Sequence, residues 1–352
     1  MRRSQRFCVL SLIALKGGNS MLQDNLYLKK ELRFQDGKFK IAMFSDMHGG
    51  KVYNKNLKRD FDAMVAALKP DLVLFSGDVF DIVADLRTEA EVRAFLDEIM
   101  EVLETNNIPW ANVYGNHERE GAFENRRLQP IFESYPNCIS KAGPADIRGT
   151  SNHMIPIKAT CGDKIVFNVW GLDSGCTVDI SDYEHDYHEP DIILENPLFN
   201  GKGYDNPNFD QVAWYFQSSL ELEQHCGEKV PSIMYFHIPI PEHNLIVKNP
   251  ERTGMVGEAR EGIACCELNH GLFAAALIRG DVKGIFVGHD HLNDFCGTYC
   301  GIKLGFNSAM CYDEYNQDDM RGCRVFEIDE ADPWNYKTYT VRAQAIVPGY
   351  GE

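Results

Sequence analysis

Several features that mark common protein classes are missing from this 352-residue sequence. No apolar run reaches about 18 uninterrupted residues, the length that a membrane-spanning helix needs, so we expect no membrane span. The formal charge is -17, with 52 acidic against 35 basic residues, and no stripe of lysine and arginine runs along the chain. Because binding to a phosphate backbone normally requires a basic patch, we expect no nucleic-acid partner.

Cysteine is too sparse for a disulfide scaffold, with eleven residues in the whole chain. None of them has the spacing of a zinc knuckle. We expect buried free thiols, with a pairing of Cys296 and Cys300, which flank a turn-like Gly-Thr-Tyr, as the alternative in an oxidising compartment. The sequence also lacks an Asn-x-Ser/Thr acceptor, which argues against a glycosylated secretory route.

Residues 1–20 begin with three arginines and continue with the apolar run Phe7–Leu15, as the first two regions of a signal peptide do. Lys16 ends the run, and no small-x-small cleavage site follows. We therefore favour a cytoplasmic protein, with secretion as the alternative if residues 1–20 act as a signal peptide.

The rest of the chain alternates between patterns typical of strands and of helices. Short apolar runs rich in Val, Ile and Phe predict buried strands at residues 38–45, 72–76, 110–114, 165–170, 232–236 and 284–287. Apolar residues on one helical face predict helices at 56–69, from Thr88 onward and at 209–224. This alternation predicts an α/β domain whose ligand site lies at the carboxyl ends of the strands. We assign the N-terminal extension to residues 1–26, either a signal peptide or disordered, the domain to 27–345 and a C-terminal tail to 346–352.

Five short segments place metal-binding side chains directly after apolar runs. They are Asp46-Met47-His48, Gly77-Asp78-Val79-Phe80-Asp81, Gly115-Asn116-His117-Glu118, Met234-Tyr235-Phe236-His237 and Gly288-His289-Asp290-His291. Each alone is a weak signal, because a single Asp-x-His is more often a surface turn than a pair of ligands. Together they offer oxygen and nitrogen ligands for two metal ions, with one histidine left over to act as an acid.

This order of segments resembles the signature of the calcineurin-like metallophosphoesterase superfamily. That signature is Asp-x-His, Gly-Asp-x-x-Asp, Gly-Asn-His-Glu, a lone His and Gly-His-x-His, and all five elements are present between Asp46 and His291. The stretches that start at Phe236 and Gly288 are similar to the branch of plant proteins named purple acid phosphatase 29-like and their fungal relatives. The resemblance covers roughly residues 30 to 330. It implies a four-layer αββα sandwich of two mixed β-sheets flanked by helices, with a dinuclear metal site at the carboxyl ends of the strands.

The resemblance also implies a ligand set for each ion. The first ion would be held by Asp46, His48, Asp78 and His291, and Asp78 would bridge to a second ion completed by Asn116, His237 and His289. Carboxylates, imidazoles and an amide carbonyl suit divalent or trivalent Fe, Mn, Zn or Co, and the absence of thiolates argues against a closed structural zinc site. Two divalent ions bring about four positive charges against two ligand carboxylates, so the centre would attract phosphate although the whole chain is acidic.

These patterns predict a metal-dependent phosphoester hydrolase that acts on a phosphorylated substrate. We expect a phosphomonoesterase that uses a metal-bridging hydroxide as nucleophile, with Asp78 as the bridging carboxylate and His117 as the general acid. The alternatives are a phosphodiesterase acting on a small-molecule or nucleotide diester and, further off, a non-catalytic scaffold. Glu118 and Asp81 are expected to orient ligands or to make hydrogen bonds within the loops. Purple enzymes carry Tyr where Asp81 stands here, so we expect no tyrosinate-to-iron chromophore.

Overall fold

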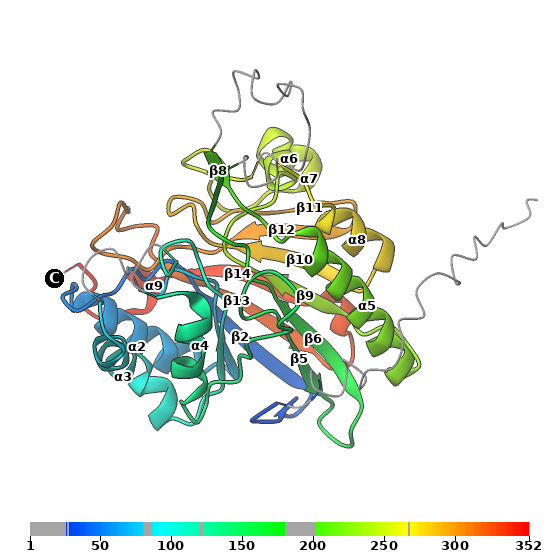
Figure 1. The fold of residues 1–352 in the computed structure, drawn as a ribbon, viewed down its shortest axis with the longest axis horizontal. Helices are drawn as coiled ribbons and strands as arrows, with labels where there is room; N and C mark the ends of the chain where they lie inside the picture. The colour runs from blue at the N-terminus through cyan, green and yellow to red at the C-terminus, as the bar shows by residue number, and fades with distance from the viewer. Residues whose placement is uncertain are drawn as a thin grey trace, which may run out of the picture.

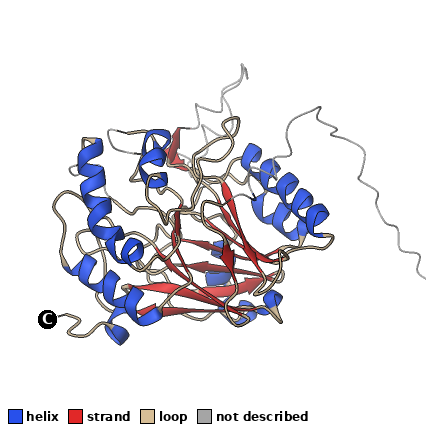
Figure 2. Cartoon of the chain, turned by 90° about the horizontal axis from the view of Figure 1, so that it is seen from below, coloured by secondary structure: helices blue, strands red, loops and turns tan. Residues whose placement is uncertain are grey.

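Two mixed β-sheets face each other at the centre of the molecule, and helices cover their outer faces (Figures 1 and 2). The computed structural model describes residue 26 and residues 28–80, 86–119, 123–179, 202–266 and 268–351. The expected four-layer αββα sandwich is therefore confirmed. Residues 1–20 and Asp81, for which the sequence suggested roles, lie outside the described residues.

The five-stranded sheet has the order β14-β13-β2-β3-β4. Its strands are β2 (Lys38–Phe44), β3 (Leu72–Phe75), β4 (Trp110–Asn112), β13 (Gly322–Asp329) and β14 (Lys337–Arg342). The first three are parallel, while β13 is antiparallel to both of its neighbours. The helices that pack on its outer face are α2 (Asn56–Leu68), α3 (Glu89–Thr105), α4 (Asn125–Glu133) and α9 (Ala343–Ile346).

The seven-stranded sheet has the order β1-β5-β6-β9-β10-β12-β11. Its strands are β1 (Leu32–Arg33), β5 (His153–Lys158), β6 (Ile165–Gly171), β9 (Ser232–Tyr235), β10 (Val282–Val287), β11 (Cys296–Tyr299) and β12 (Ile302–Phe306). The helices α5 (Phe209–Cys226), α6 (His243–Lys248) and α8 (Leu272–Arg279) cover its outer face. The remaining described elements are β7 (Thr177–Asp179), β8 (Lys202–Tyr204), α7 (Pro250–Thr253) and the 3-10 helix η2 (Pro333–Asn335).

Both faces of the central strands are buried, which explains why their sequences are continuous apolar runs. Side chains of successive strand residues point to opposite faces. In β2, Ile41 and Met43 lie in the cluster between the two sheets, whereas Ala42 and Phe44 pack against the helices. A strand covered on both sides needs no polar face, and its apolar pattern is continuous instead of alternating.

The predicted elements match the structure closely where the sequence signals were strong. The helix expected from Thr88 onward begins with a capping box, in which the Thr88 side chain accepts the backbone N–H of Glu91 and the Glu91 carboxylate accepts that of Thr88. Cys296 is buried, Cys300 is exposed, and both are free thiols, so the conditional pairing is not formed. Within the described ranges, no helix is both long and apolar enough to cross a membrane.

Candidate metal centre

The five motif segments converge on the same edge of the sandwich. Three of them follow the parallel strands β2, β3 and β4, and two follow β9 and β10 of the other sheet. Strands that run in parallel deliver their carboxyl ends to one edge, which brings distant residues together. All seven predicted ligands are buried there: Asp46, His48, Asp78, Asn116, His237, His289 and His291.

The backbone at this edge adopts a conformation that most residues avoid. Asp46, His48, Asp78 and His289 all have positive φ angles, of 50°, 47°, 51° and 76°. Such a conformation costs about 1–3 kcal/mol for a residue other than glycine and is concentrated at functional sites. Backbone hydrogen bonds from Asp46 to Gly77 (3.1 Å) and from His48 to Asp78 (3.0 Å) hold the two turns against each other.

Two glycines allow the segments to approach this closely. A Cβ atom on Gly115 would lie 2.1 Å from Oδ1 of Asp78, and one on Gly288 would lie 1.9 Å from Oγ of Ser45. Neither position has room for a side chain. The glycines of the Gly-Asn-His-Glu and Gly-His-x-His segments are therefore required by packing against the neighbouring turns.

One group of converging side chains consists of Asp46, His48 and His291. Their nearest ligand atoms all lie within 4.8 Å of one another. Nε2 of His291 is 3.5 Å from Oδ1 of Asp46, and the Nε2 atoms of His48 and His291 are 3.1 Å apart. Two imidazoles and a carboxylate thus point at a common centre, the arrangement that one metal ion requires.

A second group consists of Asp78, His237 and His289, again within 4.8 Å. Nε2 of His237 lies 2.9 Å from Oδ2 of Asp78. Nε2 of His289 and Oδ1 of Asn116 are buried without a hydrogen-bond partner. Since a buried polar atom normally has a partner, these two atoms suit the role of ligands to a cation. The residues present therefore fit a metal pair.

The orientation of His237 supports the same interpretation. Its Nδ1–H donates to the carbonyl oxygen of Ser76 at 2.9 Å. That bond keeps a proton on Nδ1, so Nε2 is the nitrogen that would give up its proton and bind an ion. Ser76 follows β3 and His237 follows β9, so the bond also joins the two sheets at the candidate centre.

Electrostatics at the site require positive charge. Burial alone would raise the pKa of Asp46, but His237, His291 and His48 outweigh burial and hold that pKa well below its usual range. Burial alone would lower the pKa of His237, but Asp78 and Asp46 raise it to about 9. In the metal-free protein, protons on histidine thus balance the two carboxylates. A metal ion would replace those protons, because ligands must be deprotonated to bind it.

His117 lies at the margin of the cluster and is only partly buried. Its backbone N–H donates to Oδ1 of Asp78 at 2.9 Å, and its ring centroid is 5.0 Å from that of His48. A ring nitrogen of His117 also lies within 4.8 Å of His48 and Asp78 ligand atoms. From this position His117 could act as a general acid toward the substrate or as a metal ligand. The variant His117→Ala distinguishes the two roles.

Sequence reasoning missed two neighbours of His291. Tyr315 stacks on the imidazole of His291, and Sγ of Cys311 lies 3.5 Å from its Nδ1. Both come from the loop between β12 and β13, which carries none of the five motifs. In the sequence, the only indication that this loop lies near the candidate site is its position after the last motif segment.

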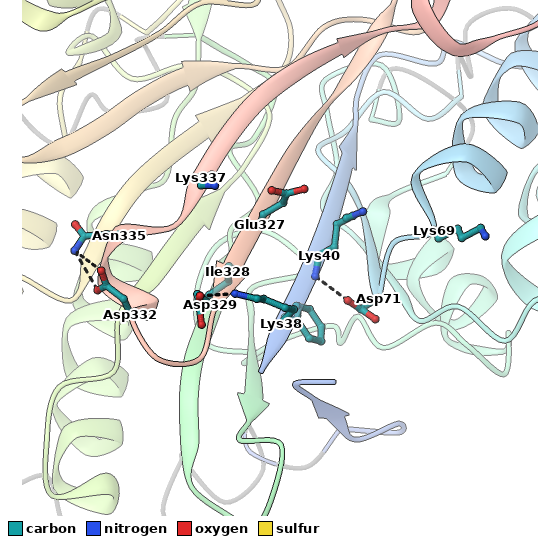
Figure 3. A pocket seen from close by; sticks show the side chains of 11 residues that line it. Lys38, Lys40, Lys69, Asp71, Glu327, Ile328, Asp329, Asp332, Asn335 and Lys337 are labelled. Carbon is teal, nitrogen blue, oxygen red and sulfur yellow. Dashed lines mark hydrogen bonds and ion pairs between the residues drawn. The ribbon is translucent and has the colours of Figure 1, made fainter. Parts of the chain in front are cut away.

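A separate cavity of about 610 Å³ lies at the opposite ends of β2 and β13 (Figure 3). Its charged side chains are Lys38, Lys40, Lys69, Lys337, Asp71, Glu327, Asp329 and Asp332. Positive and negative groups are equal in number, and Lys38 pairs with Asp329 across the strands. The residues that line the cavity include neither histidine nor cysteine.

Comparison with known proteins identifies the family of this chain. The family model described as "Calcineurin-like phosphoesterase" matches residues 39–293. The Arabidopsis thaliana protein "Probable inactive purple acid phosphatase 14" is 30% identical, over 82% of this chain and 75% of its own length. From the same plant, "Probable inactive purple acid phosphatase 29" is 29% identical over 86% of this chain and 79% of its own. A solved dimetal phosphatase from Danio rerio covers 86% of this chain and 98% of its own, with a TM-score of 0.53 and 14% identity, which shows a shared fold.

Proposed function

We propose that this chain, which belongs to the calcineurin-like phosphoesterase family, hydrolyses phosphomonoesters with the help of two metal ions. Membership of the family supports the broader activity of a metal-dependent phosphoester hydrolase. The observation that carries the proposal is the convergence of five separate segments on one buried cluster of carboxylates and imidazoles. No single segment could form such a site without the other four.

The geometry supports one assignment of ligands. Asp46, His48 and His291 would hold the first ion, while Asn116, His237 and His289 would hold the second. Asp78 would bridge them, because it lies within 4.8 Å of ligand atoms from His48 on one side and from His237 and His289 on the other. This oxygen and nitrogen donor set suits Fe, Mn or Zn.

When bound, the ions would supply an activated water and offset the negative charge on the phosphoryl oxygens. The protein's own part is to hold the ligands rigidly and to protonate the leaving group. His117 is proposed for the proton transfer, because it borders the cluster without full burial. A second, smaller cavity of about 170 Å³ is lined mainly by polar residues, among them Arg119, two residues after His117, and Arg148.

The names of the Arabidopsis relatives include the word "inactive", which brings a non-catalytic scaffold into consideration. Loss of activity in such a fold normally means loss of a ligand or of the acid. In this chain all seven proposed ligands and His117 are present. The proposal of an active enzyme rests on that complete set.

The test is steady-state hydrolysis of p-nitrophenyl phosphate and of bis-(p-nitrophenyl) phosphate by protein reconstituted with Mn²⁺. Asp78→Asn is run beside the wild type, with Asp329→Asn as a matched control at the opposite ends of the strands. Faster monoester turnover, abolished only in Asp78→Asn, supports the proposal. Faster hydrolysis of the diester would instead identify the protein as a phosphodiesterase. Full metal occupancy without hydrolysis across a broad phosphoester panel would favour the scaffold.

A further inference from the structure

Tyr315 contacts His291 in three separate ways. The two rings stack with centroids 4.1 Å apart and planes 6° from parallel. The Tyr315 carbonyl oxygen accepts the Nδ1–H of His291 at 2.8 Å, and the Tyr315 hydroxyl oxygen accepts its backbone N–H at 3.4 Å. One residue thus constrains the ring plane, the tautomer and the backbone of His291.

The side chain of Tyr315 is not explained by core packing. It remains 52% exposed, so it gains only part of the hydrophobic free energy that a buried tyrosine would gain. What it does cover is the imidazole of His291, which is itself only 4% exposed. The ring therefore shields a residue of the candidate site from water.

The loop that carries Tyr315 is itself held in place by Arg321. Nε of Arg321 donates to the carbonyl oxygen of Cys311 at 2.7 Å, and its Nη2 donates to the side chain of Asn316. The guanidinium also lies 3.7 Å from the ring centroid of Tyr312. Hydrogen bonds on both sides of Tyr315 fix the loop, so the Tyr315 carbonyl and ring meet His291 in a defined position.

We propose that Tyr315 is a positioning residue that prepares His291 to bind a metal ion. The inference rests on the proposed role of His291 as a ligand. A proton held on Nδ1 by the Tyr315 carbonyl makes Nε2, which lies 3.5 Å from Oδ1 of Asp46, the nitrogen that would bind an ion. The stacked ring prevents the imidazole from rotating away when the ion is absent. Outer groups that orient metal-ligating histidines in this way typically change metal affinity about 10- to 100-fold.

The experiment measures Mn²⁺ binding, so that it does not depend on turnover. Wild type, Tyr315→Phe, Tyr315→Leu and Tyr315→Ala are dialysed against graded free Mn²⁺, and bound metal is counted by elemental analysis. Tyr315→Phe keeps the stacked ring and should bind two ions almost as wild type does. Tyr315→Leu and Tyr315→Ala should lose affinity for one of the two ions about 10- to 100-fold and regain it at high Mn²⁺.

Tyr339→Ala is the matched control, because Tyr339 is also exposed but lies on β14 and bonds to Glu327. Native affinity for both ions in Tyr315→Leu and Tyr315→Ala would overturn the proposal. Urea unfolding of the metal-free proteins completes the test, and a loss of stability that accounts for the whole change in affinity would also overturn it. A wild type that binds two ions but hydrolyses nothing would refute the proposed function alone and leave this inference standing.

Discussion

The buried carboxylate of Glu118 accepts the backbone N–H of Asp78 at 3.0 Å. It also accepts the N–H groups of Val79 at 2.6 Å and Gly115 at 2.7 Å. A single side chain therefore fastens the turn that carries Asp78 to the turn that carries Asn116. Hydrogen bonds within the loops were one of the two roles expected of Glu118, and here they reach the backbone of the proposed ligand Asp78.

Glu118→Gln should weaken metal binding without emptying the site. The amide keeps the shape of the carboxylate, but only one of its two terminal atoms still accepts a hydrogen bond, so the bonds now made to both oxygens cannot all persist. We expect the apparent affinity for Mn²⁺ to fall about 10- to 100-fold, with turnover recovering at high metal. Elemental analysis against free Mn²⁺ measures this, with Glu98→Gln on the surface as the control. Unchanged affinity would show that these hydrogen bonds do not support the site.

His237→Ala should remove one of the two ions. Its Nε2 lies 2.9 Å from Oδ2 of Asp78, and its Nδ1–H donates to the carbonyl oxygen of Ser76, so the imidazole is held facing the site. We expect one ion per chain in place of two, and a fall in kcat of more than about 100-fold, since loss of a ligand should exceed the effect of an outer partner. His225→Ala, an exposed histidine on α5, is the control. Two ions in His237→Ala would contradict the ligand assignment.

The variant His117→Ala should show whether His117 is a general acid or a metal ligand. If His117 protonates the leaving group, the variant keeps both ions and loses about 10²- to 10⁴-fold in kcat on an alkyl phosphate. The loss should be much smaller with p-nitrophenyl phosphate, whose leaving group needs little help from a proton. Equal losses on both substrates would remove His117 from the proton transfer. A variant that loses an ion would instead make His117 a ligand.

The sequence predicted those parts of the molecule whose signal is local. The strand at 38–45 is visible because both of its faces are buried, and the site segments are visible because each is a short motif after such a strand. The strand β13 was not predicted, because its apolar run is interrupted by Arg324, which is buried (2% exposed) in the structure. Its guanidinium donates to the carbonyl oxygens of Phe306 and Asp294, which are far from it in sequence. A charge compensated only by the tertiary fold resembles a surface residue in a sequence, and the contact between Tyr315 and His291 is hidden for the same reason.

The stability of the fold should depend on the protonation of His153, a histidine away from the proposed ligands. His153 is buried, with Nε2 3.0 Å from the hydroxyl of Tyr235 and Nδ1 3.2 Å from that of Ser151. Burial, with a smaller contribution from Lys141, lowers its pKa from 6.5 to about 3. The folded state therefore keeps His153 neutral while the unfolded chain takes up a proton below pH 6.5. As a result, the free energy of unfolding should fall by about 1.4 kcal/mol for each pH unit below that value until the folded pKa is reached.

His153→Gln removes this titration while retaining polar atoms for hydrogen bonding. Urea unfolding of metal-free protein at pH 7.5 and pH 5.0 measures the acid-induced loss of stability in each variant. That loss should be about 2 kcal/mol smaller in His153→Gln than in the wild type, since pH 5.0 lies about 1.5 units below the unfolded pKa. Other titrating groups, including the histidines of the candidate centre, are common to both proteins and cancel in the difference. His225→Gln, altered at an exposed site, should behave as the wild type does. An equal loss in all three proteins would mean that His153 takes up its proton in the folded state, and that its burial does not make the fold sensitive to acid.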